Sequence, residues 1–197
     1  MGLKSVIGLL AAGLLTACGG GGDDDGPASP RGPASVNAGT VSVTEVSLPD
    51  ELGCGHPDYA EALLEAINEA RAQARTCGDQ FFPAVHALQW NLLLGQAAAG
   101  HSTDMATQDF FSHTGSDGSS SAERVRATGY QPRYQAEILA LGQGSHSQSD
   151  EVIPQSVAGW LASPPHCRIV MSPLPAELGA ACVRNGQKAW TTVNLGA

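Results

Sequence analysis

Three side chains in this sequence have types and settings that suit chemistry: His113, Glu137 and His166. His113 follows a segment with helical periodicity and precedes a glycine-rich loop, while His166 directly follows Ser163-Pro164-Pro165. Glu137 lies in the apolar segment AEILALG, where an unpartnered carboxylate is costly. Two neutral imidazoles and one carboxylate suit a divalent metal ion or a proton-transfer site. A shared site of this kind would require the fold to bring all three residues together.

Spacing alone does not join these three residues. The sequence has no H-E-x-x-H, no C-x-x-C and no nucleophile elbow of the G-x-S-x-G type. From the spacing, separate structural roles are therefore the default.

A central helix must position His113. Leu94, Ala98, His101 and Met105 recur at steps of four, three and four residues, which is the helical period. Asn91 is the expected N-cap, because its side-chain oxygen can accept from a free N–H of the first turn. The pattern stops after residue 109. His101 should therefore be a buried, hydrogen-bonded helix residue, with His113 at the mouth of the following loop.

Two further helices are marked by their own signals. Apolar residues at three- and four-residue spacing predict a helix over residues 58–75, with Asp58 as a candidate cap. Ser120 and Glu123 form an S-x-x-E capping box. The short helix that follows carries Arg124 and Arg126, which are interpreted as a solvated face.

The remaining chain predicts a helix and a small sheet. Residues 150–162 form the next helix, and residues 130–141 form a strand or an extended turn. Asn-Gly at 185–186, between apolar runs at 178–183 and 189–195, predicts a β-hairpin. About four helices interleaved with antiparallel strands indicate a layered α+β domain.

The start of the chain resembles a bacterial lipoprotein signal. Residues 1–17 combine a lysine, a short apolar run and small residues that end at Cys18. This resemblance implies cleavage before Cys18, diacylation of its thiol and, because Gly19 is not aspartate, an outer-membrane or cell-surface location. Residues 18–53 begin as a Gly/Asp/Pro-rich stretch and are interpreted as a flexible tether, although a short strand at Val41–Val46 is an alternative. The folded domain is then residues 54–197.

Composition limits the partners. The formal net charge is −9. Because contacts to phosphates need positive charge, we expect no nucleic-acid partner. Membrane contact is expected through the lipid anchor only, and the domain is expected to be a monomer.

Four cysteines remain after the anchor, and an even number in an exported chain implies two disulfides. Sequence alone allows three pairings. We favour Cys167–Cys182, which would join a helical turn to a returning strand, with Cys54–Cys77 as the second bridge.

Several segments in order resemble the CAP superfamily, which includes cysteine-rich secretory proteins, antigen 5 and plant pathogenesis-related 1 proteins. The segments are HSTDMATQDFFSHTGSDGSS, RVRATGY, AGWLASPPHCRIVMSP, ELGAAC and AWTTV. The resemblance covers about residues 58–197 and is closest to the bacterial SCP-like branch. It implies a three-layer α-β-α sandwich with a small central antiparallel sheet and an open cleft.

The family cleft commonly carries two histidines and two acids, which bind a divalent cation such as zinc in some members. The histidines fall on His113 and His166, and the first acid falls on Glu137. The second acid would fall near Ser163, at the ligand cleft. Ala136 and Ile138 replace the usual Gly and Asn, and both departures weaken a metal site. Glu137 could instead orient a histidine from behind.

Three functions follow from this resemblance. The first is a surface-anchored domain whose His/Glu cleft binds a small ligand, a lipid or a divalent cation such as zinc or magnesium. The second is a metal-assisted hydrolase in which His113 and His166 hold the ion and Glu137 activates water. The third is a structural or adhesive protein with a vestigial cleft. We expect a binding protein rather than an enzyme, and Glu137 is the only candidate catalytic residue.

Overall fold

The computed structural model describes residues 38–197. The predicted signal peptide at 1–17, the lipidation site Cys18 and the first part of the tether lie outside the described residues. Within the described residues, no helix has the length and apolar character needed to cross a membrane.

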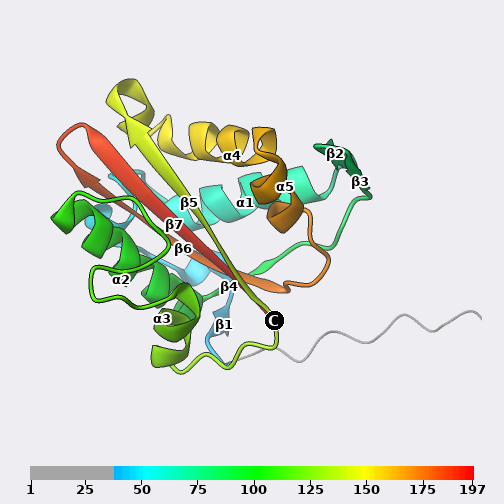
Figure 1. Cartoon of the computed structure of the whole chain (residues 1–197), viewed down its shortest axis with the longest axis horizontal. Coiled ribbons are helices and arrows are strands. Elements are labelled where there is room, and N and C mark those ends of the chain that lie inside the picture. The colour runs from blue at the N-terminus through cyan, green and yellow to red at the C-terminus, as the bar shows by residue number, and fades with distance from the viewer. Residues whose placement is uncertain (1–37) are drawn as a thin grey trace, which may run out of the picture. The chain divides into compact units, whose positions relative to one another are not determined.

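A five-stranded sheet forms the middle of the domain (Figure 1). Its strands are β1 (Thr40–Val41), β4 (Gln89–Asn91), β5 (Gln135–Gln143), β6 (Glu177–Asn185) and β7 (Lys188–Gly196), in the order β1-β4-β6-β7-β5. The three long strands pair antiparallel, whereas β4 pairs with β6 in parallel. β5 is therefore at one edge of this sheet.

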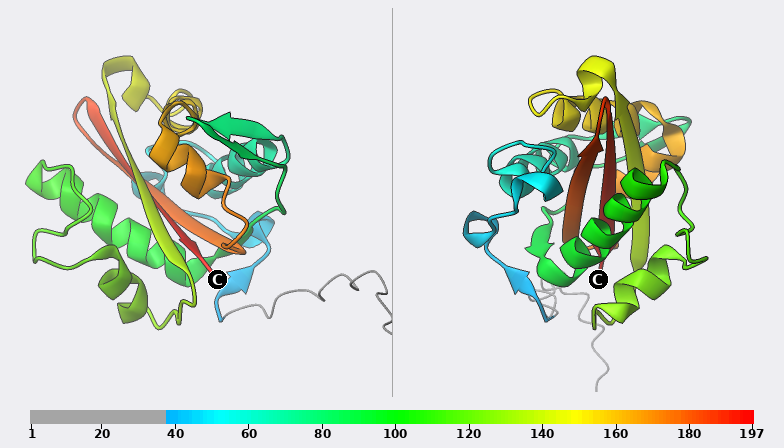
Figure 2. Two further views of the ribbon diagram at one scale, coloured as in Figure 1. Left: turned by 45° about the vertical axis from the view of Figure 1, so that its right-hand side comes forward. Right: turned by 90° about the vertical axis from the view of Figure 1, so that its left-hand side faces the viewer.

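Helices cover both faces of the sheet (Figures 1 and 2). On one face lie α2 (Leu92–Gln108) and α3 (Ser121–Ala127), and on the other lie α1 (Tyr59–Arg71), α4 (Val152–Ala162) and α5 (Pro164–Val170). The largest core cluster includes Leu63 and Trp160, and one of the smaller clusters packs Met105 against Trp190. The predicted three-layer α-β-α architecture is confirmed.

Short elements complete the fold. A two-stranded sheet, β2 (Arg75–Cys77) and β3 (Gln80–Phe82), follows α1. Helix α1 therefore ends four residues earlier than expected, because the chain turns into β2. Three 3-10 turns, η1 (Val43–Glu45), η2 (Asp50–Leu52) and η3 (Gly144–Ser147), lie in the connections.

Capping residues in the sequence correctly predicted where α2 and α3 begin. The Asn91 side chain accepts hydrogen bonds from the backbone N–H groups of Leu93 and Leu94, at 2.9 and 3.3 Å. The capping box of Ser120 and Glu123 is present in full. Asp58 occupies the N-cap position of α1, but its side chain makes no capping hydrogen bond.

The β6–β7 hairpin is also confirmed, with a shift in its turn. The register pairs Asn185 with Lys188, so the two loop residues are Gly186 and Gln187. Gly186 has a φ of 60°. This conformation suits glycine at the first loop position of a tight hairpin turn.

Residues 38–53, which the composition assigned to the tether, are part of the folded domain. Thr40 and Val41 pair with Asn91 and Trp90, and the Thr40 hydroxyl donates to Glu177. Val41, Val43, Val46 and Leu48 pack against the core. The sequence did not indicate this, because the four apolar residues are separated by polar residues and follow a stretch of low apolar content. They gain their contacts only from the folded sheet.

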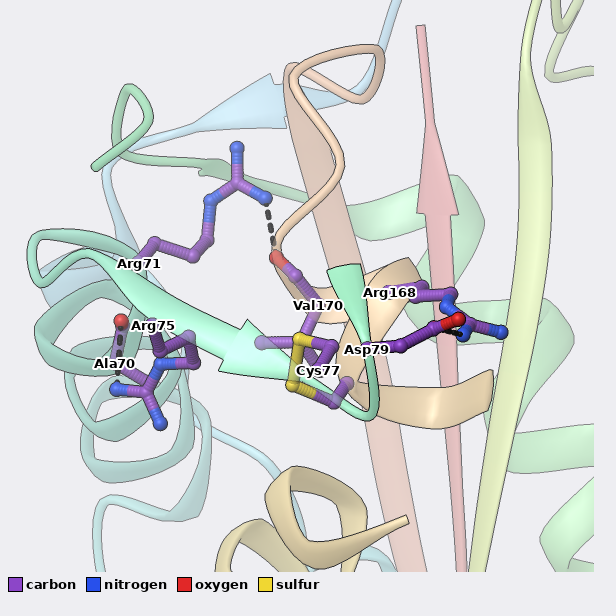
Figure 3. The surroundings of a disulfide bond; sticks show 8 residues. Ala70, Arg71, Arg75, Cys77, Asp79, Arg168 and Val170 are labelled. Carbon is purple, nitrogen blue, oxygen red and sulfur yellow. Dashed lines mark hydrogen bonds and ion pairs between the residues drawn. A yellow bond between two sulfur atoms is a disulfide. The ribbon is translucent and has the colours of Figure 1, made fainter. Parts of the chain in front are cut away.

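Four cysteines form two disulfides, but the favoured pairing is wrong. The bridges are Cys54–Cys182 and Cys77–Cys167. Cys54 lies beside β6, where Gly53 bridges to Cys182, so the first bridge joins the start of the domain to the sheet. The second joins β2 to α5 (Figure 3). The prediction had paired cysteines that are close in the sequence, because short loops are easily closed. The packing of the layers instead brings together cysteines that are far apart in the sequence.

Candidate functional site

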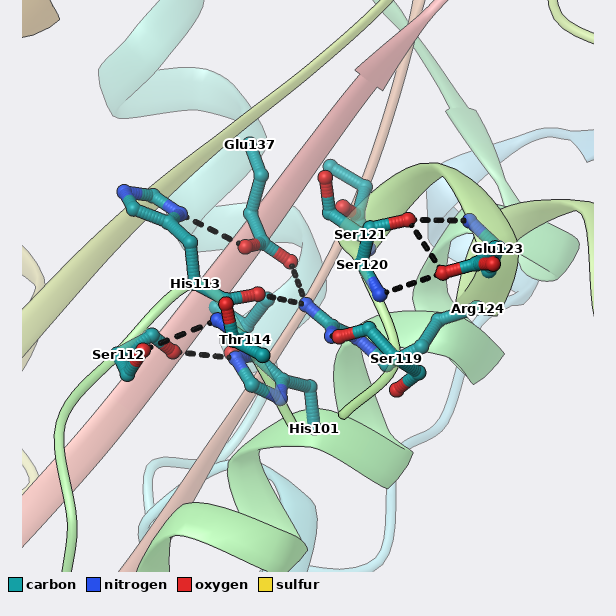
Figure 4. Close-up of polar contacts among 12 residues, drawn as sticks. His101, Ser112, His113, Thr114, Ser119, Ser120, Ser121, Glu123, Arg124 and Glu137 are labelled. Carbon is teal, nitrogen blue, oxygen red and sulfur yellow. Dashed lines mark hydrogen bonds and ion pairs between the residues drawn. The ribbon is translucent and has the colours of Figure 1, made fainter. Parts of the chain in front are cut away.

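Glu137 is buried on β5, and its side chain is only 2% exposed. The Nδ1–H of His113 donates to one carboxylate oxygen at 2.8 Å, and an Nη2–H of Arg124 donates to the other at 2.8 Å (Figure 4). Both oxygens of the buried carboxylate therefore have charged or polar partners, as a buried charge requires. The predicted proximity of His113 and Glu137 is present in the structure.

Arg124 is the residue that the sequence analysis missed. Its side chain is 13% exposed and is not part of a solvated face. Besides Glu137, its guanidinium donates to the carbonyl oxygens of Ser119 and His113, at 2.8 and 3.0 Å. The available signal was its position in the first turn after the capping box, where a long side chain can reach back over the preceding loop.

The loop between His113 and Arg124 is fixed by its own polar side chains. Asp104 of α2 accepts from the backbone N–H and the hydroxyl of Ser116, at 2.8 and 2.5 Å. Asp117 accepts from the backbone N–H of Ser119 at 2.8 Å. A Cβ at Gly115 would lie 2.7 Å from the Ser119 hydroxyl, so the Ser119 side chain packs directly against this glycine. These contacts hold the carbonyl groups that Arg124 binds.

His113 has one ring nitrogen engaged and one available. A carboxylate only accepts, so Nδ1 carries the proton that is shared with Glu137. In the neutral ring, Nε2 is then an acceptor. The side chain is 58% exposed. His113 is thus held from behind and offers an unprotonated nitrogen at the surface.

His101 and Trp190 support the segment that carries His113. His101 is fully buried, and its Nε2–H donates to the carbonyl of Ser112 at 2.8 Å. The Trp190 indole N–H donates to the carbonyl of Phe110 at 2.8 Å. Burial lowers the pKa of His101, with a further lowering from nearby Arg124. The expectation of a buried, hydrogen-bonded His101 is confirmed.

His166 lies in the first turn of α5, a helix on the opposite face of the sheet from α2. Burial lowers the pKa of His166, and His113 lowers it further. Ser163 occupies the N-cap position of α5, without a side-chain capping bond.

A metal ion would need several donor side chains arranged around one point. Within residues 38–197, no group of three or more His, Cys, Asp and Glu side chains is arranged to hold one. Glu137 has both oxygens bonded to His113 and Arg124, so it does not fit as a direct ligand. His113 does fit as a ligand through Nε2, because a ligating histidine typically donates its other N–H to a carboxylate.

Comparisons with known proteins agree with this architecture. Residues 64–195 match the family model described as CAP, the cysteine-rich secretory protein family. No curated protein sequence matches the chain.

Solved structures share the fold at low identity. An outer surface protein from Borrelia burgdorferi has a TM-score of 0.57 and 18% identity, over 69% of this chain and 90% of its own. NaASP2, solved with Zn²⁺, has a TM-score of 0.53 and 14% identity, over 77% and 82%. An extracellular SCP-domain protein from Bacillus anthracis has a TM-score of 0.51 and 18% identity. The match covers 77% of this chain but only 44% of that longer protein.

Proposed function

The chain belongs to the cysteine-rich secretory protein (CAP) family, a family of extracellular type, and from that premise we propose that it is a surface-displayed binding domain. Its binding site is the pair of imidazoles of His113 and His166, and its ligand is a divalent cation. Glu137 and Arg124 act from behind as positioning residues.

One observation carries this proposal. The Nδ1–H of His113 is bonded to buried Glu137, which leaves Nε2 as the unprotonated nitrogen of a half-exposed ring. This tautomer is the one that binds a metal ion through Nε2. A second imidazole, that of His166, would share the ion, and His113 is the second cause of the lowered pKa of His166.

The chemistry of the donors favours zinc over magnesium. Imidazole nitrogen suits zinc, whereas magnesium prefers oxygen ligands in an octahedral set. Two protein ligands are fewer than the four of a structural zinc site, so water would complete the coordination and the affinity would be modest. The solved structure of NaASP2 with Zn²⁺ supports the choice of ion.

The test is a calorimetric titration of the chain with zinc and, separately, with magnesium. We expect zinc to bind, His113→Ala and His166→Ala each to abolish measurable binding, and Glu137→Gln to weaken it by about 10- to 100-fold, as for other carboxylates behind a ligating histidine. His86→Ala is the matched control, because His86 is exposed and its ring bonds to the carbonyl of Pro175, away from His113 and Glu137. Binding that survives the loss of both His113 and His166 would end the proposal.

The hydrolase alternative has a less favourable geometry. General-base action would require a Glu137 oxygen that faces water, and both oxygens face His113 and Arg124. The structure therefore favours a binding role for this carboxylate. Turnover of a peptide or cell-wall substrate that disappears in Glu137→Gln, while zinc binding remains, would restore the hydrolase.

We further propose that Cys18 anchors the domain to a membrane. The proposal rests on the small residues before Cys18, and fold relatives that include an outer surface protein and an extracellular protein are consistent with it. Incorporation of labelled palmitate into the wild-type chain, and its loss in Cys18→Ser, is the expected result. An unlabelled, secreted wild-type chain would contradict the anchor.

A further inference from the structure

β5 is the last strand of the five-stranded sheet, so one of its edges pairs with no other strand of that sheet. Beyond the strand, Tyr134 and Ala197 exchange two backbone hydrogen bonds, at 3.0 and 3.1 Å. Antiparallel pairs alternate between bonded and non-bonded, so the even-numbered residues of β5 bond to β7. The N–H and C=O groups of Glu137, Leu139 and Leu141 therefore point away from the sheet.

Two contacts cover parts of this edge. The Trp160 indole N–H of α4 donates to the outward carbonyl of Leu139 at 2.7 Å. At the other end, η3 folds so close that a Cβ on Gly142 would lie 2.3 Å from the His146 carbonyl oxygen. Leu141 lies between these covered points. In the part of the chain that the structure describes, its outward groups take no part in the backbone hydrogen bonds found outside helices and strands.

A pocket of about 410 Å³ lies beside this open stretch. It is lined by Ala140, Leu141 and Gly142 of β5, by small residues of α4 such as Gly159, and by the polar side chains of His146 and Gln155. No Asp, Glu, Lys or Arg side chain lines it. Its size is at the low end for ligand pockets, which span roughly 300–1,000 Å³.

We propose that this edge and pocket bind an extended peptide as an added strand. The peptide backbone pairs with the N–H and C=O of Leu141, and one small apolar side chain enters the pocket against Gly159. Strand addition gains affinity from main-chain hydrogen bonds and specificity from pockets for alternate side chains. An unpaired edge next to an uncharged pocket supplies both features, which a lone apolar ligand would not use.

The peptide site lies beyond the proposed cation site and does not depend on it. Leu141 is four residues along β5 from Glu137, which is about 13 Å at the rise of a strand. The two sites can therefore be tested separately, and the peptide titration is done in the presence of a chelator.

The probe is an acetylated, amidated heptapeptide of alternating threonine and valine, titrated into the full ¹⁵N-labelled chain and followed by NMR. We expect the amide of Leu141 to shift, and hydrogen exchange at that amide to slow. Gly159→Leu fills the pocket, since a Cβ there meets nothing within 4 Å, and should weaken binding at least tenfold. Gly100→Leu is the matched control, because Gly100 is an equally open helical glycine on α2.

A second peptide, N-methylated at alternate residues, separates strand pairing from pocket filling. It keeps the side chains but loses backbone donors, so it should bind at least tenfold more weakly. Equal binding of both peptides, equal effects of Gly159→Leu and Gly100→Leu, or no shift at Leu141 would each overturn the proposal. Self-association of the chain through β5, detected by sedimentation, would overturn it as well. Because the two sites are independent, His113→Ala should lose zinc binding and retain peptide binding.

Discussion

At the scale of single residues, Arg124 determines the role of Glu137. The guanidinium bonds one oxygen of this buried carboxylate and so supplies the partner that a buried acid needs. The same carboxylate fixes the tautomer of His113. One bonded unit therefore joins Arg124 on α3, Glu137 on the edge strand β5 and His113 in the loop. Within it, only the imidazole of His113 is well exposed.

Arg124→Gln should destabilise the domain. It would leave Glu137 buried without its charged partner, and breaking a buried ion pair in this way costs about 3–5 kcal/mol. The free energy of unfolding in urea measures this loss. Arg168→Gln is the control, because its ion pair with Asp79 is exposed (Figure 3) and such pairs contribute about 0–1 kcal/mol. Equal losses in the two variants would show that the Arg124–Glu137 pair does not behave as buried.

His101 predicts a pH dependence of stability. Burial lowers its pKa in the folded state below the ordinary value of 6.5, so the unfolded chain takes up a proton first as the pH falls. Because the unfolded state then binds more protons, stability decreases as the pH drops below about 6.5 and is fully present above it. In His101→Gln, unfolding free energies measured between pH 7.5 and 5 should fall less steeply than in the wild type. Parallel slopes would assign the pH dependence to other groups.

At the scale of elements, the sequence predicted what short-range signals determine. The start of α2 follows from Asn91, the start of α3 from its capping box, and the hairpin from Asn185-Gly186. These features depend on residues fewer than five positions apart. The position of His113 at the end of a helix could be predicted for the same reason.

Features set by contacts between layers were not accessible in this way. The pairing of Cys77 with Cys167 depends on β2 lying beside α5, and the bond of Arg124 to Glu137 depends on α3 lying beside β5. Nothing in the spacing of these residues encodes which layers face each other. The family resemblance supplied the shared position of His113 and Glu137 but carried no information about the guanidinium.

The two disulfides should differ in their effect on zinc binding. Their sequence separations are 128 and 90 residues, and on a loop-entropy model either one is worth about 4–5 kcal/mol, so both pairs of Cys→Ala substitutions should lower stability similarly. Only Cys77→Ala/Cys167→Ala frees α5, which carries His166. That variant alone should bind zinc more weakly in calorimetry at a temperature where both variants remain folded. Equal zinc affinities would mean that Arg71, which donates to the Val170 carbonyl at 2.6 Å, suffices to hold α5.

At the scale of the whole molecule, the candidate cation site joins the two helical layers. His113 follows α2 on one face of the sheet, His166 begins α5 on the other, and Glu137 lies on the edge strand between them. A site of this kind exists only when the complete sandwich is assembled. The boundary of the folded domain is therefore also a condition for the function.

That boundary can be tested by comparing chains that begin at residues 38 and 54. The shorter chain lacks β1 and the four residues that pack on the core, Val41, Val43, Val46 and Leu48. Each is half-buried and, at about half the value of a fully buried side chain, contributes roughly 1 kcal/mol. We therefore expect the chain of residues 54–197 to lose about 3 kcal/mol or more of unfolding free energy in urea relative to residues 38–197. Equal stabilities would mean that residues 38–53 belong to the tether and not to the folded domain. Weaker zinc binding by the shorter chain would show that the His113–His166 site depends on the complete sheet.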